Sequence, residues 1–129
     1  MFVYEDVEPN PPEQNVKDAV RLCTAINAQA VIGLGGGSSM DVAKLTAFLG
    51  RPKQTQKLED IYGVSQCIGP RLPLVQIPTT AGTGSEVTPV SIITTNKHEK
   101  KGVVSSQLLP DLALIGKWDN LYINAYCVD

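Results

Sequence analysis

The stretch Ala30–Asp41, AVIGLGGGSSMD, decides the fold. An apolar run ends in glycines, and these open directly onto residues with helical spacing, which indicates a strand, a tight turn and a helix. Because glycine has no Cβ, backbone amides in such a turn can approach an anion closely. We expect Ser38 to cap the helix, with Asp41 as an acidic variant of the capping box near the positive end of the helix dipole. The stretch therefore has the pattern of a phosphate-binding turn.

A purely structural turn has the same pattern, so this stretch alone leaves both interpretations open. The dinucleotide fingerprint G-x-G-x-x-G is matched only in part. Gly33 and Gly35 fit, but Ser38 stands where the third glycine belongs. A second segment that could bind the same ligand would favour the phosphate-binding interpretation.

Composition narrows the class of protein. The 129 residues suit one domain. A net charge of −2 without a long basic cluster argues against a nucleic-acid surface. The apolar runs are too short for a membrane span, and the acidic segment Met1–Asp6 lacks the order of a signal peptide. Cys23, Cys67 and Cys127 lack metal-ligand spacing, so we expect reduced thiols in a cytoplasmic protein.

Helices and strands are expected to alternate along the chain. After an extended lead-in over residues 1–12, we predict helices over 13–28 and from the glycine turn to 49, and strands over 30–34, 72–78, 90–94, 103–105 and 111–115. The second helix is predicted to bury one stripe, formed by Val42, Leu45 and Leu49, and to stop at Gly50. Residues 51–70 are expected to form a surface loop with a short helix near 58–62. This order predicts an α/β architecture with a mainly parallel sheet and flanking helices.

A second unusual loop follows the strand predicted at 72–78. Residues Thr79–Thr88, TTAGTGSEVT, combine hydroxyls with small side chains that leave the backbone accessible. Ligands of parallel sheets bind at the carboxyl ends of the strands. If the strands at 30–34 and 72–78 are neighbours, their loops lie side by side and could hold a pyrophosphate, a ribose or a nicotinamide amide. A polar surface loop without a ligand is the alternative.

Four segments together resemble the iron-containing (group III) alcohol dehydrogenases. Gly35–Lys44, GGGSSMDVAK, resembles the nucleotide-binding motif of that family, and Pro78–Thr88, PTTAGTGSEVT, resembles its second signature. Leu108–Ile115 looks like the next strand, and Val7–Pro11 is similar to the family's lead-in to the first helix. The resemblance implies an incomplete Rossmann-like dinucleotide-binding domain over residues 1–115, with the all-helical metal domain absent. Residues 116–129 match nothing in the family and are interpreted as an off-family C-terminal tail.

The resemblance also implies which residues bind NAD or NADP. The pyrophosphate is assigned to Gly36, Gly37 and Ser38, with Asp41 close to the cofactor. The ribose and nicotinamide side is assigned to Thr79, Thr80, Thr83 and Ser85, with Val90 packed nearby. In the family a lysine after the following strand reaches the ribose; here it is Lys100 or its neighbour Lys101, for which a solvated turn is the alternative.

The resemblance implies a metal that this sequence is not expected to hold. In the family one aspartate and three histidines of the helical domain bind Fe²⁺ or another divalent metal. His98 is the only histidine here, so we assign no metal ligand and no catalytic residue. The family reaction passes a hydride from an alcohol to NAD(P)⁺, giving an aldehyde or ketone and NAD(P)H. The chain alone is expected to be inactive.

Our interpretation is the NAD(P)-binding portion of a metal-dependent alcohol dehydrogenase. The alternative is an inactive truncated remnant that acts as a nucleotide-binding or dimerisation module. Relatives in the superfamily, such as glycerol dehydrogenase or dehydroquinate synthase, are a third hypothesis, disfavoured by the long form of residues 79–88. The partners implied are the dinucleotide and, for the intact enzyme, a small alcohol or aldehyde, with no nucleic acid and no membrane. A homodimer stays open.

Overall fold

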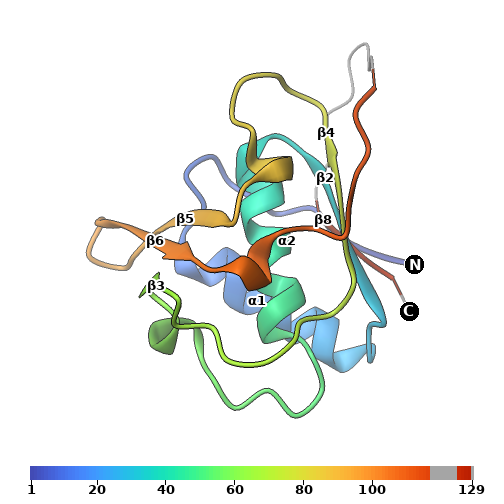
Figure 1. Ribbon diagram of the computed structural model, residues 1–129. Helices are drawn as coiled ribbons and strands as arrows, with labels where there is room; N and C mark the ends of the chain where they lie inside the picture. Colours follow the sequence, from blue (N-terminus) through green and yellow to red (C-terminus); the bar gives the residue numbers. More distant parts are fainter. Residues whose placement is uncertain (117–124, 129) are drawn as a thin grey trace.

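The computed structural model describes residues 1–116 and 125–128 as two helices packed against two β-sheets (Figure 1). The elements are β1 (Phe2–Tyr4), α1 (Glu13–Ala25), β2 (Ala30–Gly35), α2 (Gly37–Leu49), the short 3-10 helix η1 (Leu58–Asp60), β3 (Gly63–Val64), β4 (Leu74–Pro78), η2 (Ser85–Val87), β5 (Val90–Thr94), β6 (Lys100–Val104), η3 (Ser106–Leu108), β7 (Leu112–Ala113) and β8 (Ala125–Val128).

The larger sheet has the strand order β1-β8-β2-β4-β7. β2, β4 and β7 run parallel, whereas β8 runs antiparallel to both β1 and β2. β2 and β4 are direct neighbours from Val31 opposite Leu74 to Gly35 opposite Pro78. The predicted α/β fold with parallel strands is confirmed. The loops after residues 30–34 and 72–78 were expected to lie side by side if these two strands are neighbours. β2 and β4 are neighbours, so the two loops lie at the same edge of the sheet.

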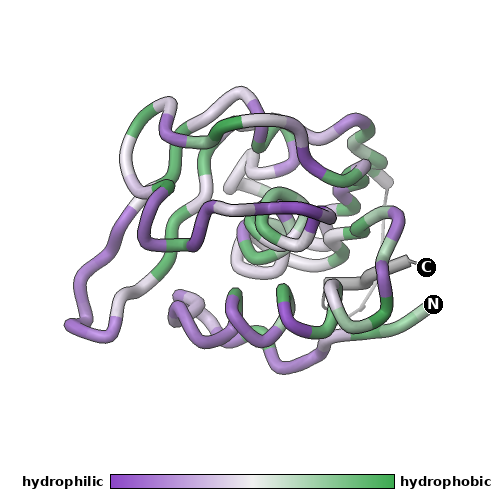
Figure 2. Tube along the Cα trace, turned by 90° about the horizontal axis from the view of Figure 1, so that it is seen from below, coloured by the Kyte–Doolittle hydropathy of each residue, from purple (hydrophilic) through white to green (hydrophobic). Residues whose placement is uncertain are grey.

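The smaller sheet has the order β3-β6-β5 and covers the opposite side of α2. Its β5–β6 hairpin projects from the molecule, and Figure 2 shows hydrophilic residues at the hairpin tip. α2 contacts β2 and β4 of the larger sheet, β5 of the smaller sheet, and α1. This helix therefore lies at the centre of the fold.

The central position of α2 corrects one prediction. The helix buries every residue from Val42 to Leu49 rather than a single stripe. Elements pack on all of its sides, so burial extends round the whole helix rather than along one face. One cluster joins α2 to α1 and the smaller sheet, with Val16, Ala19, Val42, Leu45, Phe48, Ile93 and Val103 among its members. A second cluster joins the helices to the larger sheet, with Cys23, Val31, Ala43, Ala47 and Leu74 among its members.

Several boundaries also differ from the predictions. α1 ends at Ala25 rather than near 28, because Asn27 takes a positive φ of 49° that a helix cannot continue through. β6 begins at Lys100, and β7 shrinks to two residues. β1 in the lead-in, β3 in the loop and β8 in the tail were not predicted. Each of these strands is two to four residues long. Such a short segment shows almost no periodic pattern in the sequence from which a strand could be predicted.

Candidate functional site

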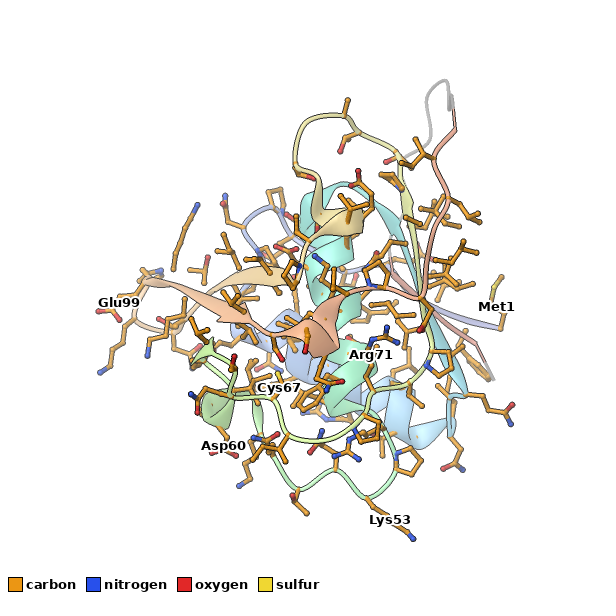
Figure 3. All side chains as sticks on the ribbon, viewed as in Figure 1. Met1, Lys53, Asp60, Cys67, Arg71 and Glu99 are labelled. Carbon is orange, nitrogen blue, oxygen red and sulfur yellow. The ribbon has the colours of Figure 1, made fainter. Side chains whose placement is uncertain are left out.

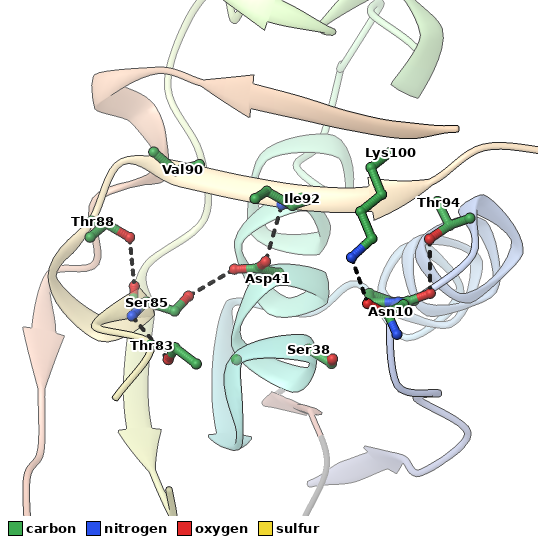
Figure 4. A pocket seen from close by; sticks show the side chains of 12 residues that line it. Asn10, Ser38, Asp41, Thr83, Ser85, Thr88, Val90, Ile92, Thr94 and Lys100 are labelled. Carbon is green, nitrogen blue, oxygen red and sulfur yellow. Dashed lines mark hydrogen bonds between the residues drawn. The ribbon is translucent and has the colours of Figure 1, made fainter. Parts of the chain in front are cut away.

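A pocket of about 400 Å³ lies beside the first turns of α2, and side chains from across the fold line it (Figure 4). Its lining residues are Asn10, Pro11, Gly37, Ser38, Asp41, Thr83, Ser85, Thr88, Val90, Ile92, Thr94 and Lys100. They come from the lead-in, α2, the loop after β4, β5 and the start of β6. Because residues this far apart in sequence converge only after folding, the pocket depends on the arrangement of both sheets around α2 (Figure 3).

The glycine turn delivers α2 to the pocket. Gly35 has a φ of 145°, which L side chains rarely adopt, and its carbonyl accepts a hydrogen bond from the Thr79 amide at 2.8 Å. Gly36 is extended and is the N-cap residue, without a side-chain cap. The prediction that Ser38 caps the helix is therefore wrong: the N-cap residue lies two positions earlier, at Gly36, and α2 starts at Gly37. Ser38 lies in the first turn and lines the pocket instead.

The hydroxyl-rich loop packs directly on the glycine turn. A Cβ added to Gly37 would lie 3.0 Å from Cγ2 of Thr83, and one added to Gly36 would lie 3.4 Å from Oγ1 of Thr80. A side chain at Gly37 would therefore have to displace the side chain of Thr83. The two loops thus form one wall, as expected for loops that follow adjacent parallel strands.

Asp41 joins three elements around the pocket. Its Oδ1 accepts a hydrogen bond from Ser85 Oγ at 2.8 Å, and its Oδ2 accepts one from the Ile92 amide at 3.0 Å. Burial raises the pKa of the Asp41 carboxyl, and these two hydrogen bonds together with the nearby Lys44 partly offset that effect. The carboxylate holds the loop and β5 against α2, rather than completing a capping box.

Lys44 lies beneath the pocket with its side chain fully buried. Its Nζ donates to Ser85 Oγ at 2.8 Å, the Val90 carbonyl at 2.8 Å and Thr88 Oγ1 at 3.3 Å. It also lies 3.8 Å from Oδ1 of Asp41. Burial lowers the pKa of Lys44 to about 8, although the carboxylates of Asp41 and Glu86 oppose the shift. A buried lysine that makes three hydrogen bonds fixes the geometry of the loop from below.

Lys44 belongs to the glycine motif, but the sequence alone assigned it no role. One signal was present: an isolated lysine stands within the apolar run from Val42 to Leu49, three residues after Asp41. Such a lysine must either reach solvent or find buried partners. Here it finds partners, and the sequence could not name them.

The structure separates the two neighbouring lysines at the start of β6. Lys100 lines the pocket, and its Nζ donates to Oδ1 of Asn10 at 3.0 Å. Lys101 lies over the ring of Tyr62, with Nζ 5.1 Å from the ring centroid, so it faces away from the pocket. Asn10 has a φ of 52° and also accepts a hydrogen bond at its carbonyl from Thr94 Oγ1. The lead-in is thereby tied to β5.

Most of the predicted cofactor-binding residues meet in this pocket. Those that line it are Gly37, Ser38, Asp41, Thr83, Ser85, Val90 and Lys100. Gly36, Thr79 and Thr80 are not lining residues; they lie at the junction of the two loops. Sequence reasoning missed the lining residues Asn10, Pro11, Thr88, Ile92 and Thr94. Asn10, Pro11 and Thr88 stood inside recognised motifs, whereas Ile92 and Thr94 carried no signal beyond their strand.

Within 1–116 and 125–128, no group of three or more histidine, cysteine, aspartate or glutamate side chains could hold a metal ion. His98 sits in the exposed β5–β6 turn, where its amide donates to the Thr95 carbonyl. Over the same residues, no helix combines the length and the apolar character needed to cross a membrane.

The family model and two relatives that match this chain are alcohol dehydrogenases. A model of the family described as "Iron-containing alcohol dehydrogenase" matches residues 1–116. Alcohol dehydrogenase 4 of Schizosaccharomyces pombe is 36% identical over 115 residues, covering 88% of this chain and 27% of the relative. Long-chain-alcohol dehydrogenase 1 of Geobacillus thermodenitrificans is 38% identical over 116 residues, covering 89% of this chain and 29% of the relative. The chain spans less than a third of the length of these relatives.

Solved structures share the fold. An iron-containing alcohol dehydrogenase of Thermotoga maritima is 41% identical with a TM-score of 0.79, and the match covers 88% of this chain and 31% of that one. The sulfoacetaldehyde reductase of Bifidobacterium kashiwanohense, solved in complex with NAD⁺, is 34% identical with a TM-score of 0.74, and the match covers 85% and 29%. The family match over residues 1–116 and these likenesses agree: the chain belongs to the iron-containing alcohol dehydrogenase family.

Proposed function

We propose that this chain is the NAD(P)-binding portion of a metal-dependent alcohol dehydrogenase. The observation that carries the proposal is the convergence of the glycine turn, the loop after β4 and Lys100 on one pocket at the start of α2. A helix N-terminus favours an anion through its backbone N–H groups and its dipole. The positive Nζ of Lys100 lines the same pocket. A pyrophosphate with its two sugars matches that combination of groups.

The residues divide into those that touch the cofactor and those that hold the wall in place. We assign the pyrophosphate to Gly36, Gly37 and Ser38, and the ribose to Lys100. Thr79, Thr80 and Thr83 are assigned to the ribose and nicotinamide side. Val90 and Ile92 add apolar surface, which suits a planar ring. NAD and NADP are both retained as cofactors.

Ser85 and Asp41 act by positioning in this proposal. Ser85 Oγ already accepts from Lys44 and donates to Asp41, so both functions of its hydroxyl are in use. Asp41 in turn is occupied by Ser85 and the Ile92 amide. These side chains keep the loop closed on the glycine turn, which sets the width of the pocket.

In the whole enzyme the reaction would oxidise a small alcohol to an aldehyde or ketone. The dinucleotide, when bound, accepts the hydride. This chain's residues bind and orient it. The described residues contain no group of three or more histidine, cysteine, aspartate or glutamate side chains that could hold a metal ion. The second candidate function is an inactive nucleotide-binding or dimerisation module. We place the protein in the cytoplasm, where the thiols of Cys23 and Cys67 stay reduced.

Titration of the chain with NADH, followed by nucleotide fluorescence, tests the proposal. Wild type is expected to bind saturably, and Gly37→Val is expected to weaken binding at least about tenfold, which corresponds to about 1.4 kcal/mol. The added side chain collides with Thr83, whose Cγ2 lies 3.0 Å from the position that the new Cβ would take.

Gly102→Val is the matched control, because a Cβ at Gly102 meets nothing closer than 3.9 Å and the position lies in β6, outside the pocket lining. Equal NADH affinity in all three proteins would refute the assignment of the glycine turn. Absence of NADH binding by a folded wild-type chain would refute the proposed function itself.

A further inference from the structure

A second cavity, of about 560 Å³, lies between α1, the end of α2 and the loop that carries η1. Its apolar lining residues are Val16 and Val20 of α1, Leu49 of α2 and Leu58 of η1. It shares no lining residue with the pocket at the start of α2. Small-molecule sites have volumes of about 300–1,000 Å³. The cavity is therefore separate from the proposed cofactor site and large enough for a ligand of its own.

The loop that forms one side of this cavity is held in place by its own side chains. Gln54 Nε2 donates to the Phe48 carbonyl at 2.9 Å, which ties the loop to α2. Gln56 lines the cavity; its Nε2 donates to the Gln66 carbonyl and its Oε1 accepts from the Ile68 amide, both at 2.8 Å. Because these bonds order the loop before a ligand binds, binding does not lose free energy in ordering it.

The floor of the cavity is apolar. Val16, Leu49 and Leu58 belong to the hydrophobic cluster that joins α2 to α1 and the smaller sheet, and they are 0%, 9% and 3% exposed. Val20 is half-buried and packs against the same cluster. Burial of apolar surface is favourable in proportion to the area removed from water. A ligand whose apolar body covers Val20 and fills the space above the floor therefore gains binding free energy.

The charged residues around the cavity leave one positive charge without a counter-charge. Lys17, Lys57 and Glu59 are its three charged lining residues. Lys17 Nζ lies 2.7 Å from Oε1 of Glu59, so α1 and η1 are joined by an ion pair whose charges cancel. Lys57 is exposed and forms no ion pair with any residue that the structure describes. The cavity is therefore complementary to a ligand that carries a single negative charge.

We propose that this cavity binds a small amphiphilic carboxylate, with its apolar chain against Val16, Val20 and Leu58 and its carboxylate at Lys57. Ligand sites commonly combine apolar walls with a few polar groups that fix the orientation of the ligand. A phosphate monoester carries about two negative charges at pH 7, more than one free ammonium can balance. The inference concerns a different part of the fold from the cofactor pocket and does not rest on nucleotide binding.

Titration of the full chain with sodium octanoate at pH 7, followed by isothermal titration calorimetry, tests the proposal. Octanoate is expected to bind saturably at one site. Acetate has the same carboxylate without the chain, and octylammonium has the same chain with the opposite charge. Each is expected to bind at least about tenfold more weakly than octanoate, because the site uses both apolar burial and charge pairing.

Three variants locate the binding site. Val20→Phe fills the cavity from its half-buried side and should weaken octanoate binding at least about tenfold. Lys57→Met removes the free charge and should weaken binding about threefold to fivefold, since exposed ion pairs contribute modestly. Lys53→Met is the matched control: it removes an exposed charge from the same loop, outside the cavity lining, and should leave the affinity unchanged. Circular dichroism checks that each variant folds.

Four results would overturn the proposal. Absence of saturable octanoate binding by the folded wild-type chain would show that the cavity takes no such ligand. Unchanged affinity in a folded Val20→Phe variant would place the ligand elsewhere. Equal binding of octanoate and octylammonium, or equal weakening by Lys57→Met and Lys53→Met, would remove the role of Lys57. Every titration is carried out without NADH, so failure here is distinguishable from failure of the proposed function.

Discussion

Replacement of Lys44 by methionine should change how the stability of the protein depends on pH. Lys44 is fully buried, and burial lowers its pKa from 10.5 to about 8. Between those two pH values the unfolded chain binds more protons at this side chain than the folded chain does. The free energy of unfolding therefore rises with pH in that interval. Lys44→Met has no titrating group at this position and lacks the contribution.

The size of the effect follows from the shift. A depression of the pKa from 10.5 to about 8 means that the buried charge costs on the order of 3 kcal/mol below pH 8. Raising the pH from 7 to 9.5 relieves about 2 kcal/mol of that cost. Loss of the hydrogen bonds to Ser85 and Val90 destabilises the variant by an amount that is independent of pH over this range. This constant loss of stability therefore does not hide the pH dependence of the difference between wild type and variant.

Urea unfolding at several pH values, followed by circular dichroism, measures the difference between wild type and variant. The difference should move by about 2 kcal/mol in favour of wild type between pH 7 and pH 9.5. Lys17→Met is the control: Lys17 is paired with Glu59 at the surface, and its pKa is raised rather than lowered. Its difference from wild type should stay flat. A flat difference for Lys44→Met as well would refute the idea of a buried ammonium under the pocket.

Two further substitutions test the packing around the site. Gly33→Ala should destabilise the fold by about 1–3 kcal/mol, because the new Cβ meets the buried Gln76 side chain in the neighbouring strand; an unchanged urea midpoint would show that Gln76 moves aside at no cost. Tyr62→Phe should cost about 1–3 kcal/mol, since its hydroxyl donates to the buried Glu13 carboxylate at 2.5 Å. The thermal midpoint measures this loss, and a midpoint at or above that of wild type would contradict it.

Local patterns in the sequence predicted the parts of the fold that depend on few neighbours. The apolar run and glycines of Ala30–Gly37 define a strand and turn through backbone sterics alone, and the structure confirms both. The stop at Gly50 is also confirmed: α2 ends at Leu49, and Gly50 is its C-cap residue with a φ of −85°. Ser38 fails as a cap because the sequence cannot show that Gly36 already takes the extended N-cap conformation.

Tertiary structure decided which of several adequate residues face the pocket. Lys100 and Lys101 are equivalent in sequence, and the orientation of β6 assigns one to the pocket and the other to the ring of Tyr62. The role of Lys44 depends on two elements distant in the sequence, the loop after β4 and the strand β5. They supply Ser85 and Val90, to which the Lys44 Nζ donates hydrogen bonds. Contacts of this kind join residues far apart in the chain, so they can be predicted from the sequence only where a known family motif implies them.

The two loops and the order of the strands show the same difference between local and tertiary information. The sequence by itself determined that two ligand-type loops follow two apolar strands, because strand, turn and composition are local properties of the chain. Only the tertiary structure decided that β2 and β4 are neighbours, and that β8 stands between β1 and β2. A four-residue strand has almost no preference of its own, since its hydrogen bonds and its burial both come from partners distant in the sequence.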